Sequence, residues 1–321
     1  MKVVVLAGGR SSEREVSLRS GDAVARGLEE AGHEAVRVTI GADGTWNADG
    51  ELVELIPTAG LLGASVAFPA LHGPFGEDGS VQGLLEWLDV PYVGSDVLSS
   101  AVCMDKLTLK RLFSEAGIVQ VDFAEAGEPA WRERCGKMGL PLWVKPSRLG
   151  SSVGISRVDD LGELDEAVER ARRHDPRVIV EAHASGREIE CSLLGNEEVE
   201  ASMPGEVVAH GDWYDYETKY RDGGMELLVP PPLADDGIAR VREQAIRAFQ
   251  LAGCAGLARC DFFVAPDATV LVNELNTMPG FTETSAYAKL WEASGLDYPS
   301  LCDRLVQLAV ERFERSRSYE L

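Results

Sequence analysis

The acidic residues best placed to act together lie in residues 259–280, a segment patterned as a β-hairpin. Two runs rich in β-branched and aromatic residues flank a polar break, which puts Asp267 and Ala268 at the tip of a turn. In that register Asp261 lies directly opposite Glu274, with Cβ atoms about 5 Å apart. Two carboxylates about 4 Å apart repel by about 4 kcal/mol at an effective dielectric constant of about 20. A divalent cation between them would turn this repulsion into attraction.

Two more polar residues share this face of the predicted hairpin. Arg259 lies opposite Asn276, and all four side chains point the same way because side chains alternate along a strand. Two carboxylates and an amide suit Mg²⁺, which uses few protein ligands and completes its shell with substrate phosphates and water. The alternatives are a solvated acidic face, and a register shifted by one residue if the turn carries a bulge.

The composition is typical of a soluble globular protein. The chain has 321 residues, enough for two or three domains, and is 45% hydrophobic and 26% charged. With 31 basic against 53 acidic residues its net charge is -22. So acidic a chain is a poor candidate for binding nucleic acid through its phosphates, or membranes through basic patches. A few local cations and a metal would still allow a phosphate-bearing ligand.

The sequence also carries signals of its compartment. No apolar run approaches the roughly 18 residues of a membrane span, and the first residues lead into a strand pattern without the features of a signal peptide. The six cysteines contain no C-x-x-C pair, so we expect buried thiols and neither a disulfide framework nor a zinc site. We therefore expect a cytoplasmic protein.

Secondary-structure patterns divide the chain into three units. Residues 1–95 alternate strands and helices, which indicates a Rossmann-like α/β domain with a parallel sheet. Residues 96–182 form a central unit, and residues 183–321 hold the hairpin and a terminal helix from about Tyr298. The predicted fold class is α/β and α+β multidomain. The predicted strands span 2–7, 34–40, 65–71, 141–147, 155–158, 177–183, 187–195 and 198–208. The predicted helices span 13–31, 80–88, 104–117, 161–175 and 235–253.

Two segments of the first unit place polar residues beside predicted strand ends. Glu15 lies near the start of the first helix, where the helix dipole favours a carboxylate, and helix capping is the alternative to a binding role. The preceding turn lacks G-x-G-x-x-G, which disfavours a nicotinamide cofactor. His72 lies in a glycine-rich loop after a strand, a usual place for ligands in α/β folds. A structural role is the more frequent one for a single histidine.

Three later segments have patterns typical of phosphate or nucleotide binding. Lys145 ends a strand, and the loop RLGSSVG after it could cradle phosphate, although it is no Walker loop and a plain hairpin turn is the alternative. The polar connection YDYETKYRDGG is typical of a lid or of a surface loop, and offers a second lysine, Lys219. Glu181 and Glu188 bracket a glycine-containing link that could hold a nucleotide base and its ribose.

Together these segments resemble the D-alanine–D-alanine ligase family of the ATP-grasp superfamily. The motifs cover nearly the whole chain in order, and eight in order are highly specific: GGRSSEREVSLRSG, LHGPFGEDGSVQG, MDKL, VKPSRLGSSVGIS, GREIECSLLGN, YDYETKY, ARCDFF and NELNTMPGF. The resemblance implies an N-terminal α/β domain followed by a two-part ATP-grasp fold that clasps ATP between antiparallel sheets. It also implies ATP-dependent joining of two D-alanines through an acyl phosphate, for peptidoglycan precursor synthesis.

The resemblance implies a set of nucleotide and metal ligands. The ATP phosphates would contact three lysines and a serine loop: Lys106, Lys145, Lys219, Ser151 and Ser152. The base and ribose would contact Glu181, Glu188 and the backbone at Ala182 and Ala184. Two Mg²⁺ ions, or Mn²⁺ in their place, would be bound by Asp261, Glu274 and Asn276, in agreement with the hairpin register.

It also implies where the two amino acids bind. Glu15 would bind the ammonium group of the first D-alanine, with His72 nearby, and Glu15, Ser151 and Tyr220 would latch the lid. Arg259 and the N–H of Gly280 would form the oxyanion site. The carboxylate of the second substrate would bind Ser285 and the N–H of Ala286. The resemblance further favours a homodimer built through the N-terminal domain.

The chain departs from the family pattern in two places. Ala286 and Ala288 stand where a bulkier apolar residue and a proline are usual, so a related ligase with a different second amino acid is the alternative function. The link VEAHASG lacks the usual hydrophobic residues, which predicts looser packing around adenine. A nucleotide-binding regulatory protein without catalysis is a third hypothesis, and the intact acids of the hairpin argue against it.

Overall fold

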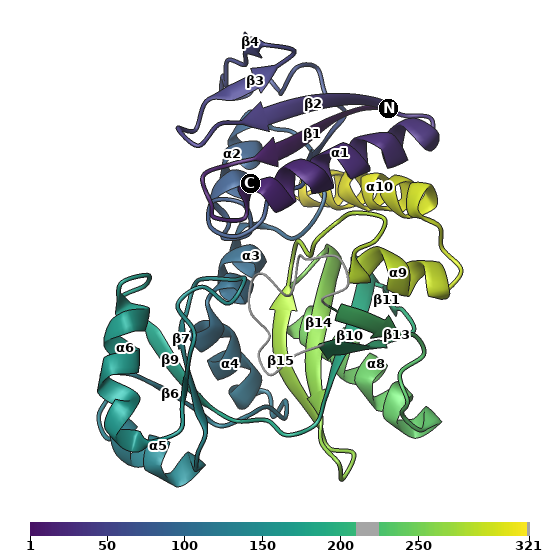
Figure 1. Cartoon of the computed structure of the whole chain (residues 1–321). Coiled ribbons are helices and arrows are strands. Elements are labelled where there is room, and N and C mark those ends of the chain that lie inside the picture. Colours follow the sequence, from purple (N-terminus) through teal and green to yellow (C-terminus); the bar gives the residue numbers. More distant parts are fainter. Residues whose placement is uncertain (210–224, 320–321) are drawn as a thin grey trace.

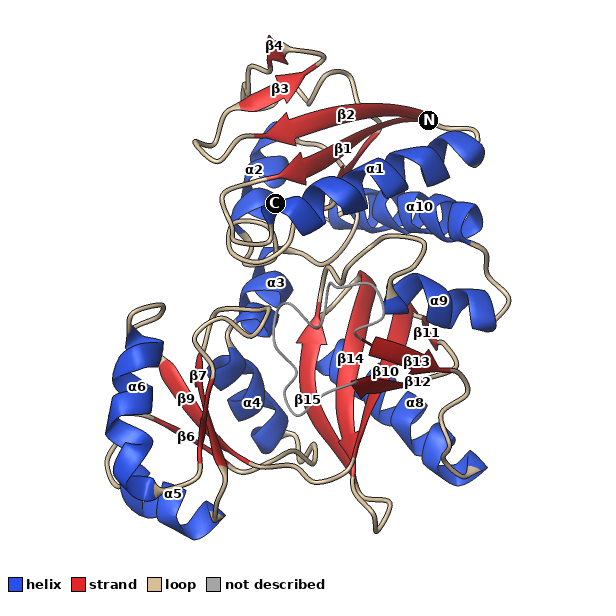
Figure 2. Ribbon diagram, in the orientation of Figure 1, coloured by secondary structure: helices blue, strands red, loops and turns tan. Residues whose placement is uncertain are grey.

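The structure is a computed structural model that describes residues 1–209 and 225–319. Within these residues it contains an N-terminal sheet, a central sheet and a C-terminal sheet, each covered by helices (Figures 1 and 2). This mixed architecture confirms the predicted fold class. In the described part of the chain, the helices all lack the combination of length and apolar character that crossing a bilayer requires.

The N-terminal sheet has the strand order β4-β3-β2-β1-β5. β1 pairs in parallel with β2 and β5, as the sequence predicts, and the unpredicted short strands β3 and β4 extend the sheet antiparallel. Alternate residues of β1 enter two separate cores, Val3 and Val5 on one face and Val4 and Leu6 on the other, because helices cover both faces. The elements are β1 (Lys2–Gly8), α1 (Arg14–Glu30), β2 (Glu34–Ile40), β3 (Trp46–Ala48), β4 (Glu51–Leu52), β5 (Val66–Pro69) and α2 (Ser80–Leu88).

The central unit is an antiparallel sheet of order β6-β9-β7-β8 with helices beside it. Its elements are α3 (Val97–Met104), α4 (Lys106–Glu115), β6 (Phe123–Glu125), α5 (Trp131–Met138), β7 (Leu142–Pro146), β8 (Ser156–Val158), a 3-10 turn (Leu161–Glu163), α6 (Leu164–Arg172) and β9 (Val178–Ala182).

The helix predicted over 104–117 is confirmed as α4, whereas α3, which ends just before Asp105, was not predicted. The backbone of Asp105 is extended, and its side chain accepts a hydrogen bond from the Thr108 N–H at 3.1 Å, which caps α4. It also accepts from Ser147 Oγ at 2.8 Å. Asp105 is thus the C-cap of α3 and the N-cap of α4, and its extended backbone separates the two helices.

The C-terminal sheet is antiparallel, in the order β13-β12-β10-β14-β15 with β11 beside β10. The strand predicted over 198–208 is divided into β11 and β12, and Pro204, which has no N–H to donate, lies between them. The elements are β10 (Arg187–Gly195), β11 (Val199–Ala201), β12 (Gly205–Ala209), β13 (Met225–Leu228), α8 (Asp235–Leu251), β14 (Gly256–Val264), β15 (Val270–Asn276), α9 (Ala286–Ala293) and α10 (Tyr298–Ser316).

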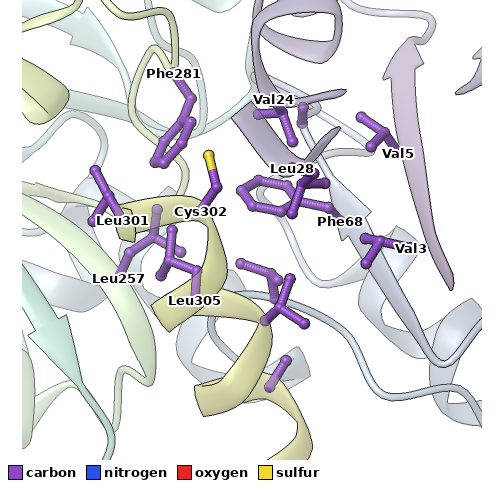
Figure 3. Packing of buried hydrophobic residues seen from close by; sticks show 14 of the residues in the cluster. Val3, Val5, Val24, Leu28, Phe68, Leu257, Phe281, Leu301, Cys302 and Leu305 are labelled. Carbon is purple, nitrogen blue, oxygen red and sulfur yellow. The ribbon is translucent and has the colours of Figure 1, made fainter. Parts of the chain in front are cut away.

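The terminal helix α10 leaves the C-terminal sheet and packs against the N-terminal unit. Figure 3 shows Leu301 and Leu305 of α10 beside Leu28 of α1 and Phe68 of β5, with Leu257 of β14 on the other side. All five side chains are fully buried. One hydrophobic core therefore joins the first and last units and fixes their relative placement.

The closest approach of α1 to its sheet depends on a glycine. A Cβ atom at Gly21 would collide with the Cβ of Ala7 in β1, whereas one at Gly136 of α5 would meet nothing within 4 Å. We expect Gly21→Ala to destabilise the protein by about 1 to 3 kcal/mol through overpacking. Gly136→Ala is the matched control, and should stabilise by up to about 1 kcal/mol through helix propensity. Urea midpoints check this, and equal effects of the two substitutions would contradict it.

Candidate active site

A cavity of about 930 Å³ lies where the three units meet. Strands β7 and β9 of the central sheet line one side and β10, β14 and β15 of the C-terminal sheet line the other, as the two facing sheets in Figure 1 illustrate. Loops of the N-terminal unit close one end through Glu13, His72 and Glu77. Residues far apart in sequence thus share one space.

The hairpin of β14 and β15 has the predicted register at its functional end. Arg259 pairs with Asn276 and Asp261 pairs with Glu274, and all four side chains line the cavity. A bulge directly after Asp261 shifts the register of the rest of the hairpin by one residue. Its location outside the four paired residues leaves the acidic face intact.

Charges on this face balance one another. The Arg259 guanidinium lies 2.7 Å from Asp261 and 3.2 Å from Glu190, and Asn276 Nδ2 donates to Asp261 at 3.0 Å. Lys106 Nζ, from the other side of the cavity, lies 3.4 Å from a Glu274 oxygen. Cationic groups therefore already neutralise the acids that the sequence predicts as metal ligands.

A second cluster of charged side chains comes from α4, β7 and β9 of the central unit. The buried carboxylate of Glu181 contacts two ammonium groups, Lys145 Nζ at 2.6 Å and Lys110 Nζ at 3.0 Å. Burial would raise the pKa of Glu181, but Lys110 and then Lys145 outweigh it and lower this pKa to about 2. Burial would lower the pKa of Lys145, but Glu181 outweighs it and raises that pKa. Glu181 and Lys145 are therefore charged at neutral pH.

The link between β9 and β10 lines the adjoining part of the cavity. Ala182, Ala184 and Glu188, which the sequence assigns to a nucleotide, all face this space. Trp143 of β7 lies beside them, and its indole N–H donates to His183 Nδ1 at 3.3 Å. The two rings lie 6.3 Å apart and are tilted by 34°, so aromatic side chains lie near the link, which the sequence analysis did not anticipate.

The glycine-serine loop after β7 reaches the N-terminal unit. Ser151 and Ser152 have left-handed backbone conformations, with φ of 52° and 60°. The Ser151 hydroxyl donates to the carboxylate of Glu13, and Lys106 Nζ donates to the Leu149 carbonyl at 2.9 Å. Side-chain contacts at both ends of the loop therefore hold a backbone that is otherwise unfavourable.

Glu15 lies in the first turn of α1, as predicted, but its side chain does not line the cavity, whereas that of Glu13 does. The Glu15 side chain is 77% exposed and pairs with Arg14 at the surface, whereas Glu13 is buried, lines the cavity and contacts Ser151. Both acids belong to the motif SSEREV, but α1 begins at Arg14, so a residue within the first turn rotates away from the cavity. The acid before the helix points inward.

His72 joins two units by hydrogen bonds. Its Nδ1 lies 3.0 Å from the Met278 carbonyl and its Nε2 lies 2.9 Å from Ser20 Oγ. Because a carbonyl only accepts, Nδ1 carries the proton and Nε2 accepts from Ser20. Burial lowers the pKa of His72. The histidine lines the cavity and connects helix α1 with the loop at Met278.

The remaining part of the cavity lies around the start of α9. Gly280, Ser285 and Ala286 all line it, and a Cβ at Gly280 would lie 3.4 Å from Ser285 Oγ. Ser285 precedes the first residue of α9, and its hydroxyl accepts from the Thr282 N–H at 3.0 Å. Ala288 is buried and packs in the hydrophobic core.

Two predicted residues, Lys219 and Tyr220, lie outside the described residues. Sequence reasoning missed four others that form or support the site: Glu13, Glu77, Lys110 and Glu190. Side chains two positions apart in a strand lie on the same face, so the spacing from Glu188 could have identified Glu190. Helical spacing was the signal for Lys110, one turn after Lys106.

Comparisons with known proteins agree with this geometry. Two family models match, the D-Ala–D-Ala ligase N-terminus over residues 2–60 and 53–95 and the C-terminus over residues 112–307. A D-alanine–D-alanine ligase of Thermoanaerobacter sp. (strain X514) is 43% identical, covering 97% of this chain and 96% of its own. The enzyme of that name from Streptococcus pneumoniae serotype 2 is 42% identical, covering 99% and 98%.

Two solved structures are also similar. The D-alanine–D-alanine ligase from Coxiella burnetii superposes with a TM-score of 0.89 at 34% identity, covering 99% of this chain and 96% of that one. The VanG D-Ala:D-Ser ligase from Enterococcus faecalis has a TM-score of 0.86 at 32% identity, covering 96% and 99%.

An N-terminal parallel sheet and two facing antiparallel sheets around a lysine- and acid-lined cavity define an enzyme of the ATP-grasp class. Within that class, the chain belongs to the D-alanine–D-alanine ligase family.

Glu77 gives the site a pH-dependent contribution to stability. Burial and then the neighbouring Glu13 raise its pKa to about 8, against hydrogen bonds from the N–H groups of Gly73 and Met278. Glu274 adds a smaller repulsion. The folded protein therefore holds a proton between about pH 4.5 and pH 8 that the unfolded chain releases, so stability falls as pH rises through this window.

We expect Glu77→Gln, which cannot ionise, to flatten this dependence by on the order of 2 kcal/mol between pH 5 and pH 8. Urea midpoints measured at several pH values check it. The same slope in both proteins would show that Glu77 does not carry the effect.

Proposed function

We propose that this protein joins two D-alanines to D-alanyl-D-alanine, at the expense of ATP and through an acyl phosphate, for peptidoglycan precursor synthesis. The observation that carries the proposal is the single cavity in which lysines of the central unit face paired acids and an arginine of the C-terminal sheet. Family membership supports the same reaction.

ATP is proposed to lie between the two antiparallel sheets. Lys106 and Lys145 contact its phosphates, and the loop carrying Ser151 and Ser152 covers them. Adenine lies against the backbone of Ala182 and Ala184 beside Glu181, and Glu188 accepts hydrogen bonds from the ribose. The aromatic surface of Trp143 is a further contact for the base.

The hairpin acids fit a divalent metal. Asp261 and Glu274 supply carboxylate oxygens and Asn276 an amide oxygen, the ligand type of Mg²⁺ or Mn²⁺. In the described part of the chain no three His, Cys, Asp or Glu residues form a metal-binding group, so phosphate oxygens complete the proposed shell. We propose two ions here, which would neutralise charge on the transferring phosphoryl group.

The first D-alanine is proposed to bind at the N-terminal end of the cavity. Glu13, in place of the predicted Glu15, holds its ammonium group, and His72 positions the surrounding loops. The carboxylate of this D-alanine attacks the γ-phosphorus, and ADP leaves. Closure of the Ser151 loop keeps out water, which would hydrolyse the acyl phosphate.

The second D-alanine is proposed to bind between β14 and α9. Its carboxylate lies at Ser285 and the Ala286 N–H, where the start of a helix favours an anion. Its amine attacks the acyl carbon, and Arg259 with the Gly280 N–H stabilises the oxyanion. Phosphate leaves and the dipeptide remains. The small side chain of Ala286 favours a larger second amino acid, as in the alternative function.

We further propose a cytoplasmic homodimer built through the N-terminal domain. Trp87 of α2 exposes a large apolar side chain, 72% exposed, which a partner would cover. All six cysteines are free and buried, which suits a reducing compartment. Light scattering tests the dimer, and a monomer at micromolar concentration would remove it.

The direct test is phosphate release from Mg-ATP with and without D-alanine, with product masses read by mass spectrometry. We expect release to depend on D-alanine and to match the formation of D-alanyl-D-alanine. Equal D-alanine and D-serine would test the alternative, with the mixed dipeptide as its signature. No D-alanine-dependent release would remove the proposal.

We expect Glu274→Gln to lower turnover at least 100-fold while the protein stays folded, because one metal-binding oxygen and its charge are lost. Circular dichroism checks the fold and the phosphate assay checks turnover. Near-normal turnover would refute the metal assignment.

Glu13 and Glu15 provide a matched pair in one motif. We expect Glu13→Gln to lower kcat/KM for D-alanine about 10- to 100-fold, the worth of a hydrogen bond between charged groups. Glu15→Gln should stay within about twofold, because its side chain points to solvent. The reverse order would restore Glu15 as the substrate-binding acid.

A further inference from the structure

Lys110 is a fully buried lysine that the proposed reaction leaves without a role. It lies on α4 one turn after Lys106, on the same face of the helix. The Lys106 side chain lines the cavity, whereas Lys110 is 2% exposed and lies behind the cavity wall. Among the described residues its ammonium group pairs with Glu181 and with no other carboxylate.

Stability alone is a weak reason for such a lysine. Moving a charge out of water costs several kcal/mol, and a buried ion pair is often no more stable than apolar residues of similar size. Phe123 adds only a distant cation–π contact, with its ring centre 5.9 Å from Lys110 Nζ. A residue this costly to bury calls for a role in the charge balance of its neighbours.

That role follows from the two oxygens of Glu181. Oε1 lies 3.0 Å from Lys110 and Oε2 lies 2.6 Å from Lys145, so one carboxylate serves two ammonium groups. The cluster of these three residues keeps one net positive charge. Only Lys145, which is 17% exposed and lines the cavity, can present that charge to a ligand. Without Lys110 the cluster would be neutral.

We propose that Lys110 is a positioning residue for phosphate binding: it offsets the carboxylate of Glu181, so that the cluster keeps one net positive charge, which Lys145 presents to the nucleotide phosphates. The inference rests on the proposed placement of ATP. With Lys110 present, Glu181 can contact the base without cancelling the positive charge of the neighbouring Lys145.

The test compares binding of Mg-ADP with binding of adenosine, by calorimetry on the full chain. The ratio of the two dissociation constants isolates the phosphates, because both ligands carry the same base and ribose. We expect Lys110→Met to reduce the advantage of Mg-ADP over adenosine about tenfold and to leave adenosine binding within about twofold. Lys137→Met is the control, since Lys137 is 73% exposed on α5 and pairs with Glu133.

A second variant tests the electrostatic mechanism. Lys110→Met combined with Glu181→Gln restores one net positive charge, so the Mg-ADP advantage should return to near the wild-type value even if the base binds less well. This pair also avoids a buried carboxylate that has lost a partner, should Lys110→Met alone fail to fold. The inference is overturned if Lys110→Met leaves the advantage of Mg-ADP over adenosine unchanged. It is also overturned if this advantage is about tenfold smaller in the double variant than in the wild type.

Lys145→Met tests the proposed phosphate site separately from the proposed role of Lys110. If it removes the Mg-ADP advantage and Lys110→Met does not, the phosphate site stands and the role of Lys110 is refuted. If Lys145→Met has no effect, the proposed phosphate site is itself wrong, and the inference for Lys110 is refuted with it.

Discussion

The ion pair between Lys106 and Glu274 spans the cavity. The rest of the site depends on the same balance between acids on one wall and cations on the other. Lys106 belongs to the central unit and Glu274 to the C-terminal sheet, so the contact of 3.4 Å joins two units that share no strand. Acids on one wall repel one another unless cations from the opposite wall or a metal offset them. In the proposed reaction the nucleotide phosphates and their metal replace this pairing.

The N-terminal unit completes the site because a hydrophobic core holds it in place. Helix α10 follows the C-terminal sheet in sequence but packs on α1 and β5, and Figure 3 shows the shared core. Hydrogen bonds of His72 and Glu77 to Met278 continue this attachment up to the cavity wall. Apolar burial supplies the bulk of the attachment, and the polar contacts set the position of the loops that carry Glu13.

The serine loop is the least regular part of the described site. Ser151 and Ser152 are in the left-handed region, which disfavours residues other than glycine by about 1 to 2 kcal/mol each. Contacts with Glu13 and Lys106 at its ends hold this conformation. Backbone strain held by neighbouring units is typical of loops that must respond to a ligand. The loop therefore connects the proposed phosphate and first-substrate positions physically.

The sequence by itself determined what depends on short-range periodicity. It predicted the parallel strands of the first unit and the pairing of Asp261 with Glu274, because strand alternation and turn position fix a hairpin register locally. Motif order was enough to identify the family.

Only the tertiary structure decided which side chains of a motif enter the cavity. Glu13 and Glu15 look alike in sequence, and the point where α1 begins sends one inward and the other to solvent. The break at Asp105 and the burial of Lys110 behind Glu181 likewise depend on the central sheet, which local patterns do not contain. Periodicity within a segment fixes its own geometry, but the direction of a side chain relative to a distant wall is set by packing between segments.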